Sequence, residues 1–233
     1  MNITELLNRR SDLSTFLVHL TREFKGTSAR DNLNNILKLR TIEARTMYGP
    51  LKNRLEPAGK NLDSQKCVCF TETPLEYTYL LVARIENRQF EFGPYAVAIT
   101  KRVARKRGIN PIWYLDITPG HPWLAQNVDR LADRFLANNS SDFDVEGLFP
   151  FIDHMGTGEN YKKEFWWERE WRYQGDFLLP DTVICLCPED EIEYFAASLK
   201  AAGLAGSCID PHWSLEKIIA RLAGFDSSEI DVV

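Results

Sequence analysis

The sequence contains no long hydrophobic run. No window holds the 18 or so consecutive apolar residues that a transmembrane helix requires. The polar segment 1–10 also lacks the apolar stretch typical of a secretory signal. Internal repeats and low-complexity tracts are missing as well. We therefore expect a cytoplasmic protein that does not contact membranes.

Disorder throughout the chain is also excluded. Of the 233 residues, 44% are hydrophobic and 12% are aromatic, which is more than a disordered chain carries. The length suits one sizeable hydrophobic core. We predict a single domain over residues 1–233.

The cysteines do not suggest a disulfide framework, because their number is odd and the expected compartment is reducing. The five are Cys67, Cys69, Cys185, Cys187 and Cys208. Two Cys-x-Cys pairs lie in the apolar runs CVCF and VICLC, which read as buried strands. Zinc sites favour wider spacings in loops. We therefore expect buried core thiols and no metal.

The net charge of -5 hides a difference between the two halves of the chain. Residues 1–110 hold 19 Lys and Arg against 11 Asp and Glu, a balance of +8. Residues 111–233 hold 9 against 22, a balance of -13. A basic half is compatible with an acidic ligand such as a nucleic acid. Attraction between the two halves inside one fold is the alternative.

Short strands and helices alternate along the chain. The pattern predicts an α/β (α+β) fold with one mixed central sheet and flanking helices. We expect a loop over residues 49–65, irregular structure over 138–163 and a strand over 165–173. Further strands are expected at 15–20, 67–71, 95–100, 111–115 and 183–187, and helices at 29–39, 124–135, 192–199 and after Ser214.

Two short segments present polar side chains at strand ends. In VHLTR (18–22), His19 and Thr21 lie on one face of the predicted strand. In CFTETP (69–74), the hydroxyl groups of Thr71 and Thr73 precede a proline that ends the strand. Each pair could bind a ligand. A satisfied, half-buried histidine and an ordinary turn are the structural alternatives.

The segment EFWWEREWRY (164–173) contains three Trp, three Glu and two Arg. In an extended strand, Glu168, Glu170 and Arg172 share one face. Neighbouring carboxylates repel each other and raise the pKa of one of them, which favours a functional site. A ladder of cross-strand ion pairs is the alternative. The basic run KRVARKR (101–107) is typical of a solvated helix face, although it could also contact phosphates.

Three of these features together resemble the AbiGi family of abortive phage resistance proteins, which are described as antitoxins of two-gene systems. They are CFTETPL, the stretch FGPYAVAITK to GINPIWYL, and WWEREWR. The resemblance covers residues 15 to about 180, so we divide the chain into a family core (15–180) and a β-α-β-α extension (181–233). It implies a role in phage defence and a cognate toxin as partner.

The order of His19, Thr71 and Thr73, and Glu168-x-Glu170 is also similar to ADP-ribosyltransferases, and the first segment looks like DarT-type enzymes. Threonines stand where those enzymes have serines or a tyrosine. The similarity implies NAD as substrate and no metal. It implies the catalytic residues Glu170 at the ribose 2′-hydroxyl, Glu168 as base and His19. It implies that NAD is bound by Thr21, Arg22, Arg45, Tyr48, Thr71 and Thr73, with Arg54 as a further partner for the pyrophosphate.

The leading hypothesis is a phage-defence protein with an ADP-ribosyltransferase-like site acting on NAD and on a nucleic-acid or protein acceptor. One alternative is a non-enzymatic antitoxin that binds a partner toxin. The other is a metal-dependent nuclease using Glu72, Glu168 and Glu170. Against it, no Asp-x-Asp pair or histidine-rich ligand set lies close to these residues in the sequence, and EREWR does not supply the lysine that usually follows the carboxylate pair.

Overall fold

The computed structural model describes residues 10–85, 88, 90–120, 122–137, 143–159 and 161–225. The fold is of the mixed α+β class, as predicted, and the chain forms two compact units. Unit 1 consists of Met1–Thr41, Thr71–Arg107 and Leu178–Val233, and unit 2 of Ile42–Phe70 and Gly108–Phe177. The short strands β2 (Thr41–Ile42) and β11 (Phe177–Leu178) lie where the chain passes from one unit to the other.

Unit 1 is built on a mixed sheet with the strand order β13-β12-β5-β1. The strands β12 and β13 are parallel, whereas β12 with β5 and β5 with β1 are antiparallel. Their apolar runs are buried, as expected for strands with both faces covered. The bounds are β1 Phe16–Leu20, β5 Ala96–Thr100, β12 Thr182–Leu186 and β13 Ala205–Ile209.

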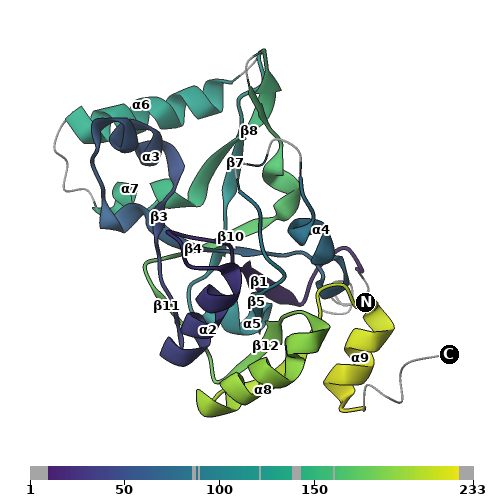
Figure 1. Ribbon diagram of the computed structural model, residues 1–233. Helices are drawn as coiled ribbons and strands as arrows, with labels where there is room; N and C mark the ends of the chain where they lie inside the picture. The colour runs from purple at the N-terminus through teal and green to yellow at the C-terminus, as the bar shows by residue number, and fades with distance from the viewer. Residues whose placement is uncertain are drawn as a thin grey trace. The chain divides into compact units, whose positions relative to one another are not determined.

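The helices of unit 1 begin where the sequence signals predict. Ser28 caps α2 (Ala29–Leu39) by accepting a hydrogen bond from the backbone N–H of Asp31, and Ser214 caps α9 (Leu215–Ala223) in the same way. The helices α2 and α8 (Ile192–Ala201) lie side by side (Figure 1). The remaining short helices are η3 Leu75–Tyr77, α4 Tyr79–Val82, α5 Lys101–Lys106 and η6 Glu189–Glu191.

The predicted β-α-β-α order of the C-terminal segment is present as β12, α8, β13 and α9. This segment is more than an appendage, because β12 pairs with β5 in the sheet of unit 1. The three predicted apolar residues of α2, Leu33, Ile36 and Leu37, are buried.

Unit 2 contains two groups of strands. One follows the order β3-β4-β10-β6 and the other the order β7-β8-β9. The first group comprises β3 Thr46–Met47, β4 Lys66–Thr71, β10 Glu170–Gln174 and β6 Asn110–Pro111. The second comprises β7 Trp113–Asp116, β8 Ile152–Gly158 and β9 Tyr161–Lys163.

The helices α3 (Gly49–Leu55) and α6 (Trp123–Ala137) share a core in unit 2 and lie close together in Figure 1. That core consists of Met47, Leu51, Leu55, Ala132 and Phe149. Shorter helices are η1 Glu56–Ala58, η2 Asp63–Gln65, α7 Phe143–Glu146, η4 Phe149–Phe151 and η5 Phe165–Glu168. None of the helices in the described ranges combines the length and the apolar character needed to cross a membrane.

Three predictions for unit 2 are wrong. The expected loop at 49–65 contains α3, because Pro50 fits the first turn of a helix while Leu51 and Leu55 bury one helix face. The expected irregular segment 138–163 contains α7, η4, β8 and β9, while residues 138–142 and 160 of it lie outside the described ranges. The expected strand 165–173 begins only at Glu170, because η5 occupies its first half.

Candidate functional site

A buried arginine lies at the centre of a polar cluster in unit 2. The side chain of Arg172 on β10 is 0% exposed. It donates from Nε and Nη2 to the two carboxylate oxygens of Glu170, at 2.8 and 2.9 Å. It also donates to Asp153 Oδ2 at 2.7 Å and to the carbonyl of Pro150 at 2.7 Å. The guanidinium group is thus surrounded by acceptors, as a buried charge requires.

Local structure explains the geometry of the pair. Glu170 and Arg172 are two residues apart on β10, so their side chains lie on the same face of the strand. Arg169 adopts a left-handed conformation (φ +48°) that ends η5 and starts β10. Glu168 is therefore the last residue of η5, and the prediction that it shares a strand face with Glu170 is wrong. The hydroxyl of Tyr114 accepts the backbone N–H of Glu170 at 3.2 Å.

Arg172 and Asp153 are both charged at neutral pH. Burial lowers the pKa of Arg172, but the carboxylates of Glu170 and Asp153 outweigh burial and hold that pKa above its usual range. Burial likewise raises the pKa of Asp153, but Arg172 and Lys163 outweigh it and leave the pKa below its ordinary value. Lys163 also forms an ion pair with Asp153. The result is a network of fixed charges.

Tyr48 and Cys69 border this network, and both are half-buried. The guanidinium of Arg172 lies over the ring of Tyr48, 4.2 Å from its centroid. Burial raises the pKa of the Cys69 thiol well above its ordinary value, and the nearby Glu170 carboxylate adds to the effect. Burial also raises the pKa of Tyr48. Both groups are therefore neutral, which excludes Cys69 as a thiolate nucleophile.

Within the cluster, the carboxylate of Glu170 is the group best placed to contact a ligand. Arg172 fixes its orientation, and the side chain keeps 17% of its surface exposed. The two carboxylate oxygens have about four lone pairs in all, so the two hydrogen bonds from Arg172 and one from the Cys69 thiol leave acceptor capacity on this group. Such a carboxylate can accept a hydroxyl hydrogen bond from a ligand and stabilise positive charge that develops nearby.

The residues predicted from the sequence fall into both units. His19, Thr21, Arg22, Thr71 and Thr73 belong to unit 1, and Glu168, Glu170, Arg45 and Tyr48 belong to unit 2. The structure brings Tyr48 and Glu170 together around Arg172. The convergence of the whole predicted set on one pocket stays a prediction.

Within unit 1, the two polar segments are neighbours. Thr71 pairs with Val18, the residue before His19, and His19 itself is half-buried opposite Val97. The hydroxyl groups of Thr71 and Thr73 are 2.8 Å apart.

The hydroxyl of Thr21 contacts the carbonyls of Ala29 and Tyr95 at 2.8 and 3.0 Å. These contacts explain Thr21 as a structural residue, and its role in binding NAD stays a prediction.

The predicted phosphate-binding arginines have local partners. The guanidinium of Arg22 lies 4.5 Å from the ring centroid of Phe90. The exposed Arg45 pairs with Glu43 at 2.9 Å. Arg54 on α3 pairs with Asp133 of α6 at 2.5 Å and with Asp129 at 3.2 Å. A pyrophosphate would have to replace these partners or share the arginines with them.

The basic run 101–107 forms α5 and its C-terminal end, and Ala104 is the residue that this helix buries. Lys101 pairs with Glu72 at 2.6 Å. This geometry agrees with the solvated helix face that the sequence predicts for this segment. Contact with nucleic-acid phosphates stays a prediction.

Sequence reasoning missed Asp153 and Cys69 as members of the cluster. Asp153 lies in the segment predicted to be irregular, so the pattern does not place it on β8, from which its side chain reaches Arg172 of β10. For Cys69, the sequence predicts a core thiol like those of the other cysteines. The sequence predicts that Arg172 shares a strand face with Glu170, and the two side chains do form an ion pair.

Comparison with known proteins agrees with the resemblance seen in the sequence. The AbiGi family model, described as an abortive phage resistance protein and antitoxin, matches residues 34–186. The match includes the predicted segments CFTETPL and WWEREWR but not VHLTR (18–22). No curated protein and no solved structure matches the chain. Since the match covers more than half of the chain, the protein belongs to the AbiGi family of abortive phage resistance proteins, described as antitoxins.

Proposed function

We propose that this chain acts in abortive infection as an NAD-dependent ADP-ribosyltransferase, with Glu170 as its essential carboxylate. The observation that carries the proposal is the partly exposed carboxylate of Glu170, whose orientation is fixed by its contact with the buried Arg172. A buried ion network is costly to desolvate, and such networks with shifted pKa values concentrate at functional sites.

In the proposed reaction, the bond between the ribose C1′ and the nicotinamide nitrogen breaks, and nicotinamide leaves with the bonding electron pair. The acceptor then forms a bond to C1′ and loses one proton. The ribose carries positive charge in the transition state, as in glycoside cleavage. Glu170 accepts a hydrogen bond from the 2′-hydroxyl and stabilises that charge. Glu168 is proposed as the base that removes the acceptor proton.

Replacing Glu170 by glutamine tests the proposal. The variant Glu170→Gln keeps the shape of the side chain but removes its charge, so we expect at least a 100-fold loss of NAD turnover, in the range found when a charge-stabilising group is removed. Release of nicotinamide from NAD is measured by chromatography. The matched control is Glu43→Gln, which removes an exposed carboxylate of unit 2 outside the cluster, and it should leave turnover unchanged.

The circular dichroism spectrum must show that Glu170→Gln still folds. Saturating NAD should also raise the melting temperature of the wild-type protein, because a ligand that binds the folded state stabilises it. If neither nicotinamide release nor this rise is detected, the enzymatic proposal is wrong.

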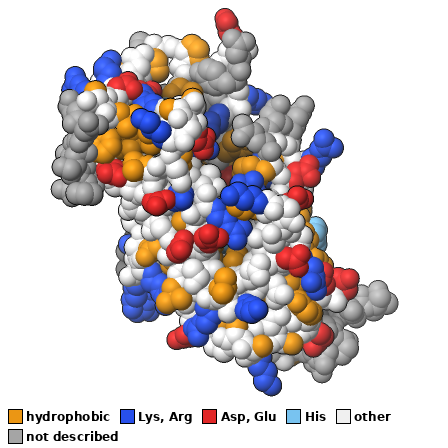
Figure 2. All heavy atoms as spheres, turned by 60° about the vertical axis from the view of Figure 1, so that its left-hand side comes forward, with side chains coloured by type: hydrophobic (Ala, Val, Ile, Leu, Met, Phe, Trp, Pro, Cys, Tyr) orange, Lys and Arg blue, Asp and Glu red, His pale blue; other side chains and the backbone are white. Residues whose placement is uncertain are grey.

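A partner-binding antitoxin is the second candidate, and the exposed tryptophans of unit 2 favour it. Trp113, Trp123 and Trp166 expose 53%, 62% and 53% of their surface. A groove of about 410 Å³ in the same unit is lined mainly by Leu55, Leu62, Phe135 and Leu136. In the space-filling view of Figure 2, hydrophobic side chains gather in the upper part of the picture, at the height of α3 and α6 in Figure 1. Exposed tryptophans are frequent anchors of protein interfaces.

The two candidates predict opposite results in cells that carry this chain together with its toxin. If the chain neutralises the toxin by binding, Trp123→Ala should cause growth arrest while Glu170→Gln has no effect. If the chain acts as an enzyme, Glu170→Gln should abolish its effect on growth or phage protection and Trp123→Ala should not. Growth curves and phage plating efficiency measure both outcomes, with Leu39→Ala, an exposed residue of unit 1, as the control.

A further inference from the structure

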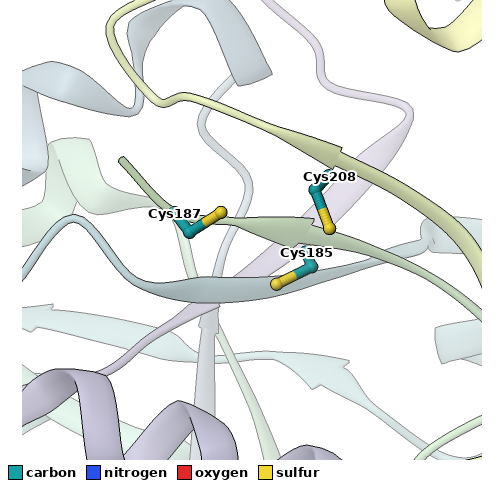
Figure 3. Close-up of side chains that lie close together, drawn as sticks. All are labelled: Cys185, Cys187 and Cys208. Carbon is teal, nitrogen blue, oxygen red and sulfur yellow. The ribbon is translucent and has the colours of Figure 1, made fainter. Parts of the chain in front are cut away.

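Three cysteine thiols lie close together at the strands β12 and β13 of unit 1. Cys185 on β12 and Cys208 on β13 are directly paired across the parallel strands. Cys187 directly follows the last residue of β12, Leu186, and its backbone N–H donates to the carbonyl of Ile209 at the end of β13. The three sulfur atoms all lie within 4.8 Å of one another, and Figure 3 shows how the side chains gather at the two strands.

The cluster is enclosed by the protein. Cys185 and Cys187 are 0% exposed and Cys208 is 1% exposed, and all three cysteines are free of disulfides. An ordinary apolar core distributes its cysteines among aliphatic side chains. Here three polarizable sulfur atoms contact one another instead, and such a set is the preferred donor set of soft metal ions.

We propose that Cys185, Cys187 and Cys208 together bind one soft d10 metal ion, zinc or cuprous copper, through three thiolates. With metal–sulfur bonds of about 2.3 Å, three sulfurs around one ion are separated by roughly 3.8–4.0 Å. The sulfur atoms lie within 4.8 Å of one another, so each pair would need to approach by about 1 Å at most to bind one ion. Rotation of the side chains about their Cα–Cβ bonds supplies this movement.

Charge balance is compatible with an enclosed ion. Binding of a divalent ion replaces three thiol protons, so a zinc ion with three thiolates carries a net charge of -1, and three protons are released. The positive charge of Arg221 on α9 interacts favourably with a thiolate at Cys208, and its sign is opposite to that of the bound site. Glu191 acts on Cys187, but its own carboxylate is paired with Arg30 at 2.6 Å.

The site would join β12 to β13 and thereby stabilise the C-terminal part of unit 1. Cys187 and Cys208 lie after residue 186, where the family match ends. The proposed metal site is thus independent of the proposed enzymatic activity, whose cluster lies in unit 2. In the sequence the site was hidden, because Cys208 is distant along the chain from the Cys-x-Cys pair.

Cobalt(II) is the probe for the zinc arm of the test. The purified, reduced and metal-free full chain is titrated with Co²⁺, and we expect intense thiolate-to-cobalt charge-transfer absorption that saturates at one ion per chain. Added zinc should abolish this absorption by displacement. Titration with Cu(I) under anaerobic conditions, against a chromophoric copper chelator, is the second arm. Saturation at one ion in either arm supports the site and identifies its metal.

Cysteine variants connect the signal to the cluster. Cys208→Ser should lose the charge-transfer band and the transfer of copper from the chelator. The matched control is Cys67→Ser, which removes another buried cysteine outside the cluster and should keep both signals. If Cys208→Ser fails to fold, Cys187→Ser is the second variant. A zinc-dependent rise in melting temperature should be seen for the wild-type protein and for Cys67→Ser.

Two results would overturn the proposal. One is a wild-type chain that gives no charge-transfer band with Co²⁺ and takes no copper from the chelator. The other is a folded Cys208→Ser or Cys187→Ser variant that binds the ions as well as the wild-type chain does. Either result would identify the three thiols as core residues alone.

Discussion

Replacing Arg172 by methionine is expected to lower the free energy of unfolding by about 3–5 kcal/mol, because it leaves two carboxylates without their buried partner. The guanidinium of Arg172 is 0% exposed and binds both Glu170 and Asp153. Methionine fills a similar volume, so the effect reports the lost charge more than a cavity. Urea unfolding followed by circular dichroism measures the change.

The matched control is Arg45→Met, which removes an exposed arginine that pairs with Glu43. An exposed ion pair contributes at most about 1 kcal/mol, so this variant should unfold close to the wild-type midpoint. The double variant Arg172→Met/Glu170→Leu should recover part of the loss, because it removes one of the stranded charges. Equal midpoints for Arg172→Met and Arg45→Met would show that the buried network contributes nothing to stability.

Several helices and strands of unit 1 could be predicted from local features of the sequence. The capping serines and apolar spacing of α2 and α9 are local signals, and the structure confirms both helices. The apolar runs of β1, β5 and β12 are equally local. In these segments propensity, periodicity and burial all favour the same structure.

The candidate site depended on structure that local signals do not encode. The prediction of an extended strand through residues 165–173 assumed a regular backbone, but the left-handed Arg169 separates η5 from β10. This turn separates Glu168 from the strand that carries Glu170. The partner Asp153 comes from β8, and pairing between distant segments cannot be derived from periodicity.

The cysteines illustrate the same limit. Spacing alone placed Cys185 and Cys187 in a buried strand, and the structure confirms that both are buried. Their approach to Cys208 follows from the parallel register of β12 and β13, in which Cys185 lies opposite Cys208. The register of the two strands depends on the α8 crossover between them and on packing. The sequence around Cys208 therefore does not predict which residue of β12 it pairs with.

Replacing Gly206 by alanine is expected to destabilise unit 1 by about 3–5 kcal/mol, because both the backbone and the available space require glycine. Gly206 has φ +142°, and a Cβ atom there would lie 1.7 Å from the backbone carbonyl oxygen of Val183. Gly206 and Val183 are direct partners in the β12–β13 pair. The strands would have to separate next to the pair formed by Cys185 and Cys208, so the variant should also weaken metal binding at the proposed site.

Gly203→Ala is the matched control for Gly206→Ala. Gly203 also has a positive φ, +66°, but nothing lies within 4 Å of the position that its Cβ would take. Alanine at this position costs only the strain of the left-handed conformation, about 1 kcal/mol. Chemical denaturation of the two variants therefore separates steric overlap between strands from backbone strain. If Gly206→Ala loses no more stability than Gly203→Ala, the close approach of β13 to Val183 is not the constraint that holds these strands in register.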